Sequence, residues 1–150
     1  MKVKIKLLND KAKVPFKTYD EDFCYDCVAT SCEEIAPNVY KYGLGFATEI
    51  VRPNYYELKN DMCISIDARP RSSVWKTGMV LSNCEGTIDE LFRGEICAIF
   101  YHVMPNMPRY QVGDKIIQIK LGSAPTMEFE VVDELSDTKR GAGGWGSTGK

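Results

Sequence analysis

Hydrophobic and polar side chains alternate along much of the chain, and this alternation predicts β-strands. The segment 1–8 alternates lysines with Val, Ile and Leu, which is typical of a strand with one buried face. The segment 62–68 places Met, Ile, Ile and Ala at every second position, with Cys, Ser and Asp between them. Ile96–Met104 is a longer apolar and aromatic run, which favours a strand that is buried on both faces. No window keeps apolar residues three and four positions apart over several turns, so the pattern does not predict helices.

Turn-forming residues separate these predicted strands. Lys115–Leu121 and Met127–Val132 are two further strand candidates, and the sequence Gly-Ser-Ala-Pro at 122–125 predicts a turn between them. Glycine or proline also recurs at short intervals through the middle of the chain. Many short strands joined by regular turns predict an all-β domain of the sandwich, jelly-roll or barrel type.

Composition and charge narrow the class of protein. The chain has 150 residues, 44% of them hydrophobic and 27% charged, which is an ordinary globular balance and enough for one domain with its own core. The formal net charge of −2 gives no basic surface for nucleic acid, and no apolar run approaches the length of a membrane span. Neither nucleic acid nor a membrane is therefore expected as a partner. A small anionic substrate would need local arginines or a metal ion to balance its charge.

Six cysteines, at positions 24, 27, 32, 63, 84 and 97, raise the question of disulfides or a metal site. The N-terminal segment lacks the pattern of a signal peptide, so we expect reduced, buried thiols in a cytoplasmic protein, or a nuclear one if the host has a nucleus. Cys24 and Cys27 have the spacing of half a zinc site. No second pair with this spacing follows and His102 is the only histidine, so core packing is the ordinary interpretation.

The C-terminal segment Arg140–Lys150 is rich in glycine and allows three interpretations. A solvated, disordered end is the most ordinary, and the segment taken alone favours it. A dinucleotide fingerprint or a P-loop fits poorly, because no helix follows and Ser147 stands where a P-loop requires lysine. The third interpretation is a phosphate-binding segment, in which glycine N–H groups and the hydroxyls of Ser147 and Thr148 surround an anion beside the charge of Arg140. Trp145 would then stack on a base.

Three earlier segments gather groups that can bind anions or water. In Arg69–Ser73, a proline fixes the backbone while an arginine and two serines bring several donors together, although the same sequence fits an exposed turn. Gly86–Glu95 has two glycines eight residues apart around an apolar and acidic centre, which predicts a tight hairpin. Asp89 near its tip could orient water or simply cap the turn. Val112–Ile119 predicts a turn that enters a strand, with Gln118 among apolar neighbours.

Together these segments resemble the five ordered motifs of the trimeric dUTPase family. The first departs most, with Phe-Cys-Tyr-Asp where the family usually has Ala-Gly-Tyr-Asp, and the last has Trp where Phe is usual. One short motif is weak support, but five in the family's order and spacing, from about Phe16 to the C-terminus, are specific. The matching segments are Phe23–Asp26, Pro70–Ser73, Gly86–Gly94, Gly113–Gln118 and Arg140–Gly149.

The resemblance implies the fold, the assembly and the reaction. Residues 1–135 would form a jelly-roll-like β-domain, and residues 136–150 a Gly-rich arm that closes a neighbouring subunit's active site. The assembly would be a homotrimer with its sites at the subunit interfaces, each site drawing on different chains. The reaction would be hydrolysis of dUTP to dUMP and pyrophosphate, which supplies dUMP for thymidylate synthesis and keeps uracil out of DNA.

The resemblance also implies the residues of the site. Asp89 would activate the water that attacks the α-phosphorus with the help of Mg²⁺, and Asp26 would hold that metal in its second shell, through water. Phe92 replaces the family's usual Tyr and is expected to keep the selection for deoxyribose. Uracil and deoxyribose would be bound by Asn83, Gly86, Ile88, Phe92, Cys97 and Trp145. The phosphates would be bound by Arg71, Ser72, Ser73, Gln118, Arg140, Ser147 and Thr148.

Three alternative functions stay open at this point. A dCTP deaminase is similar in fold and shares the Arg-Ser-Ser sequence, but it needs a catalytic Glu and has no need of the arm. A phage-type regulatory protein uses such a body to bind a protein partner, often through an extra module, and Ile96–Val112 shows no such insertion. A pseudoenzyme or structural trimer would be suggested by loss of Asp89 or Arg140, and both are present. A regulatory protein partner is not excluded.

Overall fold

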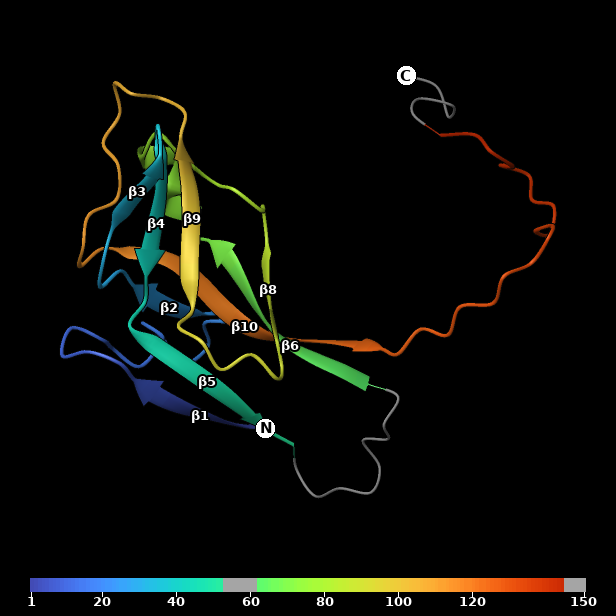
Figure 1. Cartoon of the computed structure of the whole chain (residues 1–150), viewed down its shortest axis with the longest axis horizontal. Helices are drawn as coiled ribbons and strands as arrows, with labels where there is room; N and C mark the ends of the chain where they lie inside the picture. The colour runs from blue at the N-terminus through green and yellow to red at the C-terminus, as the bar shows by residue number, and fades with distance from the viewer. Residues whose placement is uncertain (53–61, 145–150) are drawn as a thin grey trace.

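The structure is a computed structural model that describes residues 1–52 and 62–144 of the chain, and β-strands dominate it (Figure 1). The one helical element described is a short 3-10 helix, η1 (Ser72–Lys76), which follows strand β6 (Met62–Pro70). No helix of the described residues is long and apolar enough to cross a membrane. The strands are β1 (Lys2–Leu7), β2 (Tyr25–Val28), β3 (Glu33–Ala36), β4 (Val39–Gly43), β5 (Phe46–Val51), β6 (Met62–Pro70), β7 (Met79–Leu81), β8 (Gly86–Asp89), β9 (Cys97–His102) and β10 (Lys115–Pro125).

The strands form three antiparallel sheets. The smallest pairs β1 with β5, and the two larger sheets have the orders β2-β10-β6-β8 and β3-β4-β9-β7. Neighbours within the larger sheets are mostly distant in the sequence, as in Greek-key and jelly-roll architectures and unlike a simple meander. The prediction of an all-β domain is therefore confirmed.

The core lies between the two four-stranded sheets and contains a cluster of aromatic rings. Tyr42 of β4 and Phe100 of β9 are fully buried, and their ring centroids lie 5.9 Å apart in an edge-on arrangement. The Tyr42 hydroxyl donates a hydrogen bond of 2.9 Å to the backbone oxygen of Tyr110, so its polar end is satisfied. Ile116 and Ile117 of β10 are also fully buried. This packing fixes β10, which lies between β2 and β6 and contributes Ile117 and Gln118 to the candidate site.

Four predictions from the local patterns are corrected. β1 forms as predicted but has no buried face, since five of its six residues are exposed and only Ile5 is half-buried. The turn predicted at 122–125 is absent, because β10 continues to Pro125 and pairs with β6 along its whole second half. Glycine fits there because the Asp67 carboxylate lies where a side chain at position 122 would stand. The run Ile96–Met104 is not buried on both faces, since burial alternates along β9 and Tyr101 is 47% exposed. Met127–Val132 forms no strand in the single chain.

The cysteines are all free, and they are only partly as expected. Cys27 is buried, Cys24 and Cys97 are half-buried, and the other three are exposed, so the prediction of buried thiols is wrong for those three. Burial, and after it the charge of Asp26, raises the pKa of the Cys27 thiol. In the part of the chain that the structure describes, no group of three or more His, Cys, Asp or Glu side chains is placed to hold a metal ion.

Candidate active site

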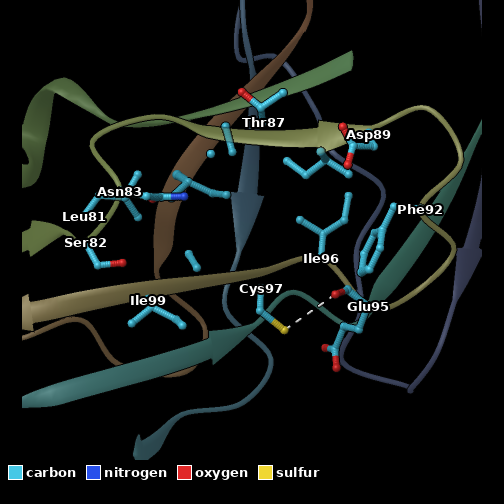
Figure 2. Close-up of a pocket in the computed structure, with 15 residues that line it drawn as sticks. Leu81, Ser82, Asn83, Thr87, Asp89, Phe92, Glu95, Ile96, Cys97 and Ile99 are labelled. Carbon is cyan, nitrogen blue, oxygen red and sulfur yellow. Dashed lines mark hydrogen bonds between the residues drawn. The ribbon is translucent and has the colours of Figure 1, made fainter. Parts of the chain in front are cut away.

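A cavity of about 330 Å³ opens between β8 and β9, and we call it the Asn83 cavity. Figure 2 shows Asn83, Ile96 and Phe92 in the space between the two strands. Five of the six residues expected to bind a base and sugar line it, namely Asn83, Gly86, Ile88, Phe92 and Cys97, and so does Asp89. The sixth, Trp145, lies outside the described residues.

The Asn83 cavity exists because Gly86–Glu95 is not the paired hairpin that the sequence predicts. β8 and β9 belong to different sheets, and in the described part of the chain β8 pairs with β6 alone. The backbone edge of β8 that faces the cavity therefore keeps N–H and C=O groups free for a ligand. Gly86 leaves room beside them, because a Cβ at this position would lie 3.3 Å from Nδ2 of Asn83.

A tight turn at the end of β8 brings an acid and an aromatic ring to the mouth of the cavity. The Phe92 N–H donates to the Asp89 carbonyl at 3.0 Å, which closes the turn 89–92. Phe92 is 46% exposed, and its ring lies over Gly94, where a Cβ would come within 2.5 Å of Cζ. A side chain at position 94 would displace the ring, so glycine here sets the ring's position.

Two polar groups that line the cavity, Cys97 and Glu95, are already engaged. Burial, and after it the charge of Glu95, raises the pKa of the Cys97 thiol, so this thiol is neutral at pH 7. The Glu95 carboxylate accepts the N–H of Gly45 at 2.7 Å, at the left-handed turn between β4 and β5. Glu95 thus fixes a backbone turn through one of its carboxylate oxygens.

A second cavity, also of about 330 Å³, surrounds Asp26 of β2, and we call it the Asp26 cavity. The Arg71 Nε donates to Asp26 Oδ1 at 2.7 Å, and Nη2 lies 3.3 Å from Oδ2. Nη1 of the same arginine donates to Ser73 Oγ at 3.2 Å. Ser72 and Gln118 line the cavity, and the Gln118 amide donates to the Pro70 carbonyl at 3.1 Å. Four of the residues expected to bind phosphate therefore lie together, namely Arg71, Ser72, Ser73 and Gln118.

Lys115 also belongs to this group, although the sequence did not indicate it. Its Nζ lies 3.0 Å from Asp26 Oδ2, so one carboxylate faces two cations. Simple alternation along β10 would place Ile116, and not Lys115, on the face of Gln118. A bulge between Lys115 and Ile117 sets Lys115 opposite Val28 and brings it to the Asp26 side. The Asp26 cavity consequently has an excess of positive charge from these three groups.

The two cavities lie apart in one chain. Ile117 lines the Asn83 cavity and its neighbour Gln118 lines the Asp26 cavity, and adjacent residues of a strand point to opposite faces. Asp26 pairs with Gln118, and Asp89 pairs with Ser65, which pairs with Gly122. Four residues of strand and three strand spacings therefore separate Asp26 from Asp89, which is roughly 20 Å.

The chain beyond β10 leaves the sheets altogether (Figure 1). Arg140 donates from Nε to the Gly143 carbonyl at 2.7 Å and is not among the described residues that line either cavity. Met127, Phe129, Val131 and Leu135 are between 73% and 99% exposed, which leaves an apolar row uncovered. Ser147 and Thr148, expected to bind phosphate, lie outside the described residues.

The sequence is similar to known proteins of one family. The dUTPase family model matches residues 56–149. A deoxyuridine 5'-triphosphate nucleotidohydrolase of Nautilia profundicola is 35% identical, with 100% of each chain covered. The protein of the same name from Clostridium tetani is 33% identical, with 99% of this chain and 97% of the relative covered.

Solved structures are similar in fold. A dUTPase of Staphylococcus bacteriophage 80alpha, solved with dUpNHpp, superposes with a TM-score of 0.78 at 21% identity and 99% coverage of both chains. A dUTPase from phage phi11 of S. aureus, described with a structural Mg(II) ion, has a TM-score of 0.69 at 18% identity, covering 91% of this chain and 100% of that one. At this identity the likeness establishes the fold, which is the jelly-roll-like one expected from the motifs.

Proposed function

This chain belongs to the dUTPase family, and from that premise we propose that Asp89 and the two cavities hydrolyse dUTP to dUMP and pyrophosphate. The activity itself is the one named for relatives that match the chain along its whole length. What is proposed is the part that each residue plays. The observation that carries it is the meeting of Asn83, Phe92 and Asp89 at one cavity.

Uracil would lie in the Asn83 cavity. The free backbone edge of β8 and the Asn83 amide would bind its polar edge, as a neighbouring strand would. Cytosine presents an amine where uracil presents a carbonyl oxygen, so a donor of the site would then face a donor. Such a buried mismatch costs about 1–3 kcal/mol, which is enough to reject dCTP.

Deoxyribose would pack on the Phe92 ring. Because Gly94 lets that ring lie close to the backbone, a 2′-hydroxyl would meet carbon atoms and lose its hydrogen bonds to water. Ribonucleotides are therefore expected to bind and react poorly. The phenol of the family's usual Tyr is not required for this exclusion.

Asp89 would orient the attacking water and take its proton. The water oxygen would bond to the α-phosphorus, and the bond from that phosphorus to the oxygen bridging to the β-phosphate would break. Pyrophosphate would leave with the electron pair of this bond. The carboxylate lies at the exposed end of β8, where both water and substrate have access.

Phosphate groups would be bound by the Asp26 cavity and the arm. Asp26 engages Arg71 through Nε and Nη2, which leaves N–H donors of the guanidinium beside Ser73 for phosphate oxygens. Ser72, Ser73 and Gln118 would add neutral donors for the α- and β-phosphates. The γ-phosphate would be bound by Arg140, Ser147 and Thr148 of the arm, with Trp145 stacked on uracil.

Mg²⁺ is the expected cofactor, and the donors in the Asp26 cavity fit a metal held mainly by the substrate. Mg²⁺ keeps several waters and binds through phosphates and one or two carboxylates, so it needs no cage of protein ligands. Asp26 would hold it through water, in its second shell. When bound, the ion would neutralise and orient the triphosphate.

The site would be completed by other copies of the chain. A carboxylate that activates the water and the groups that bind the attacked phosphate must lie within hydrogen-bond reach, about 3 Å, of the same reacting atoms. In one chain Asp89 and Asp26 lie roughly 20 Å apart. The Asn83 cavity of one subunit would therefore meet the Asp26 cavity of a second in a homotrimer. Residues 1–135 would be the β-domain, and residues 136–150 would be an arm that crosses to a neighbouring subunit. The exposed apolar row that follows β10 supports such a contact between subunits.

Pyrophosphate release from four nucleotides tests this function. With Mg²⁺, dUTP should be hydrolysed at least about 100-fold better than dCTP, dTTP or UTP, because each competitor loses a pairing or meets a steric block. Release of ammonia from dCTP would instead indicate the deaminase. Equal turnover of all four would contradict the roles given to Asn83 and Phe92.

A further inference from the structure

The turn 89–92 carries both the carboxylate and the aromatic ring assigned above, yet few contacts hold it. β8 is an edge strand whose pairing with β6 ends at Asp89 and Ser65. Leu91, at the tip of the turn, is 82% exposed and contributes little packing. Apart from the packing of the Phe92 ring on Gly94, the position of the turn 89–92 must therefore come from polar contacts.

One ion pair supplies such a contact from a distant part of the chain. Arg52 follows β5, and its Nε and Nη2 donate to the two oxygens of Glu90 at 2.7 and 2.6 Å. Nη2 also donates to the Met62 carbonyl at 3.0 Å, at the start of β6. The guanidinium thus joins β5, β6 and the turn, with parallel hydrogen bonds that fix direction as well as distance.

The geometry points to Arg52 and Glu90 as positioning residues of this enzyme, which set where Asp89 and Phe92 stand. This inference rests on the proposed roles of those two residues. Glu90 lies between them in the turn, so a movement of its carboxylate moves the carboxylate of Asp89 and the ring of Phe92 together. Arg93 also holds the turn, since its Nη1 donates to the carbonyls of Glu90 and Phe92 at 2.6 and 3.0 Å.

A second ion pair near the same cavity offers a comparison. Arg69 of β6 binds Glu85, which precedes β8, but through one nitrogen and one oxygen and with side chains that are 47% and 43% exposed. The Arg52 and Glu90 side chains are 36% and 22% exposed and bond through both carboxylate oxygens. Exposed single-contact pairs contribute little, whereas bidentate Arg–carboxylate pairs constrain geometry. The hydrogen bonds from Arg52 also lower the pKa of Glu90, so the pair stays charged at neutral pH.

Matched variants test the inference. Glu90→Gln should lower the dUTP turnover number about 10- to 100-fold, since small misplacements of a reacting group have effects of this size. The preference for dUTP over UTP should fall about tenfold as the ring of Phe92 moves. Glu85→Gln is the control, and both of its values should stay within about twofold of wild type.

The ratio of dUTP to UTP turnover separates positioning from folding. A loss of folded enzyme lowers both turnover numbers by one factor and leaves their ratio unchanged. Arg52→Gln should reproduce the change in ratio, and Arg52→Gln combined with Glu90→Gln should lose no more than either alone. Equal behaviour of Glu90→Gln and Glu85→Gln, an unchanged ratio, or additive losses in the double variant would overturn the inference. Asp89→Asn is measured in parallel, to separate failure of the proposed function from failure of this inference. Full activity of Asp89→Asn would refute the proposed role of Asp89 itself, and not merely its positioning by Arg52 and Glu90.

Discussion

Replacement of Asp89 by asparagine is expected to lower the turnover number for dUTP by about 100- to 10,000-fold, the usual contribution of a general base. The amide has nearly the same shape as the carboxylate, so the turn 89–92 should keep its geometry. It cannot take a proton from water, however, and it carries no charge to polarise the water. Pyrophosphate release gives the turnover number, and binding of dUpNHpp should change by less than about tenfold, since the loss is in the transition state.

Asp10→Asn serves as the matched control. Asp10 is exposed, lies near the N-terminus and lines neither cavity among the described residues. Its replacement should leave turnover and binding unchanged. If Asp89→Asn and Asp10→Asn have the same turnover number, Asp89 is not the base.

Arg71→Ala has the second-largest expected effect, a fall of about 100- to 1,000-fold in kcat/KM for dUTP. The guanidinium binds Asp26 and Ser73 and presents its remaining donors to the Asp26 cavity. Without it, the developing charge on the phosphates loses its main fixed counter-charge, although Lys115 still neutralises Asp26. Arg71 would contact phosphate in the ground state, and more strongly in the transition state as charge develops, so KM should rise and kcat should fall.

Arg71→Lys and Arg69→Ala sharpen this measurement. Lysine keeps the charge but cannot bind two oxygens with one planar group, so an intermediate loss is expected. Arg69 lies two residues away and forms the exposed pair with Glu85, so Arg69→Ala should stay close to wild type. A loss at Arg69 as large as that at Arg71 would mean that general positive charge, and not a specific arginine, binds the phosphates.

Local patterns in the sequence predict the strands and the segments of the site well. Alternation indicates both β1 and the first part of β6, but only β6 has one face in the core, whereas β1 is exposed apart from a half-buried Ile5. The failures occur where a tertiary contact overrides the local pattern. Gly122 was expected in a turn but sits within β10, since only glycine leaves space for the Asp67 carboxylate.

The candidate site shows the same limit. Residues adjacent in the chain, such as Arg71 with Ser72, could be grouped from the sequence. The contact of Lys115 with Asp26 depends on a bulge, and that of Arg52 with Glu90 joins residues 38 positions apart. Spacing along the chain contains no signal for either. The opening between β8 and β9 was likewise missed, because two glycines around an acidic centre favour a paired hairpin as readily as a cavity.

The central claim, that one active site combines the Asn83 cavity of one copy with the Asp26 cavity of another, is tested most directly by mixing two inactive variants. Asp89→Asn and Arg71→Ala chains, carrying different tags, are co-expressed, and assemblies that hold both tags are purified and assayed with dUTP. In a trimer that holds both variants, one of the three sites should draw an intact cavity from each, so about a third of wild-type turnover should return. Co-expression of Arg71→Ala with Gln118→Ala, both in the Asp26 cavity, should restore none. Mixed Asp89→Asn and Arg71→Ala assemblies that are no more active than either variant alone would contradict the account.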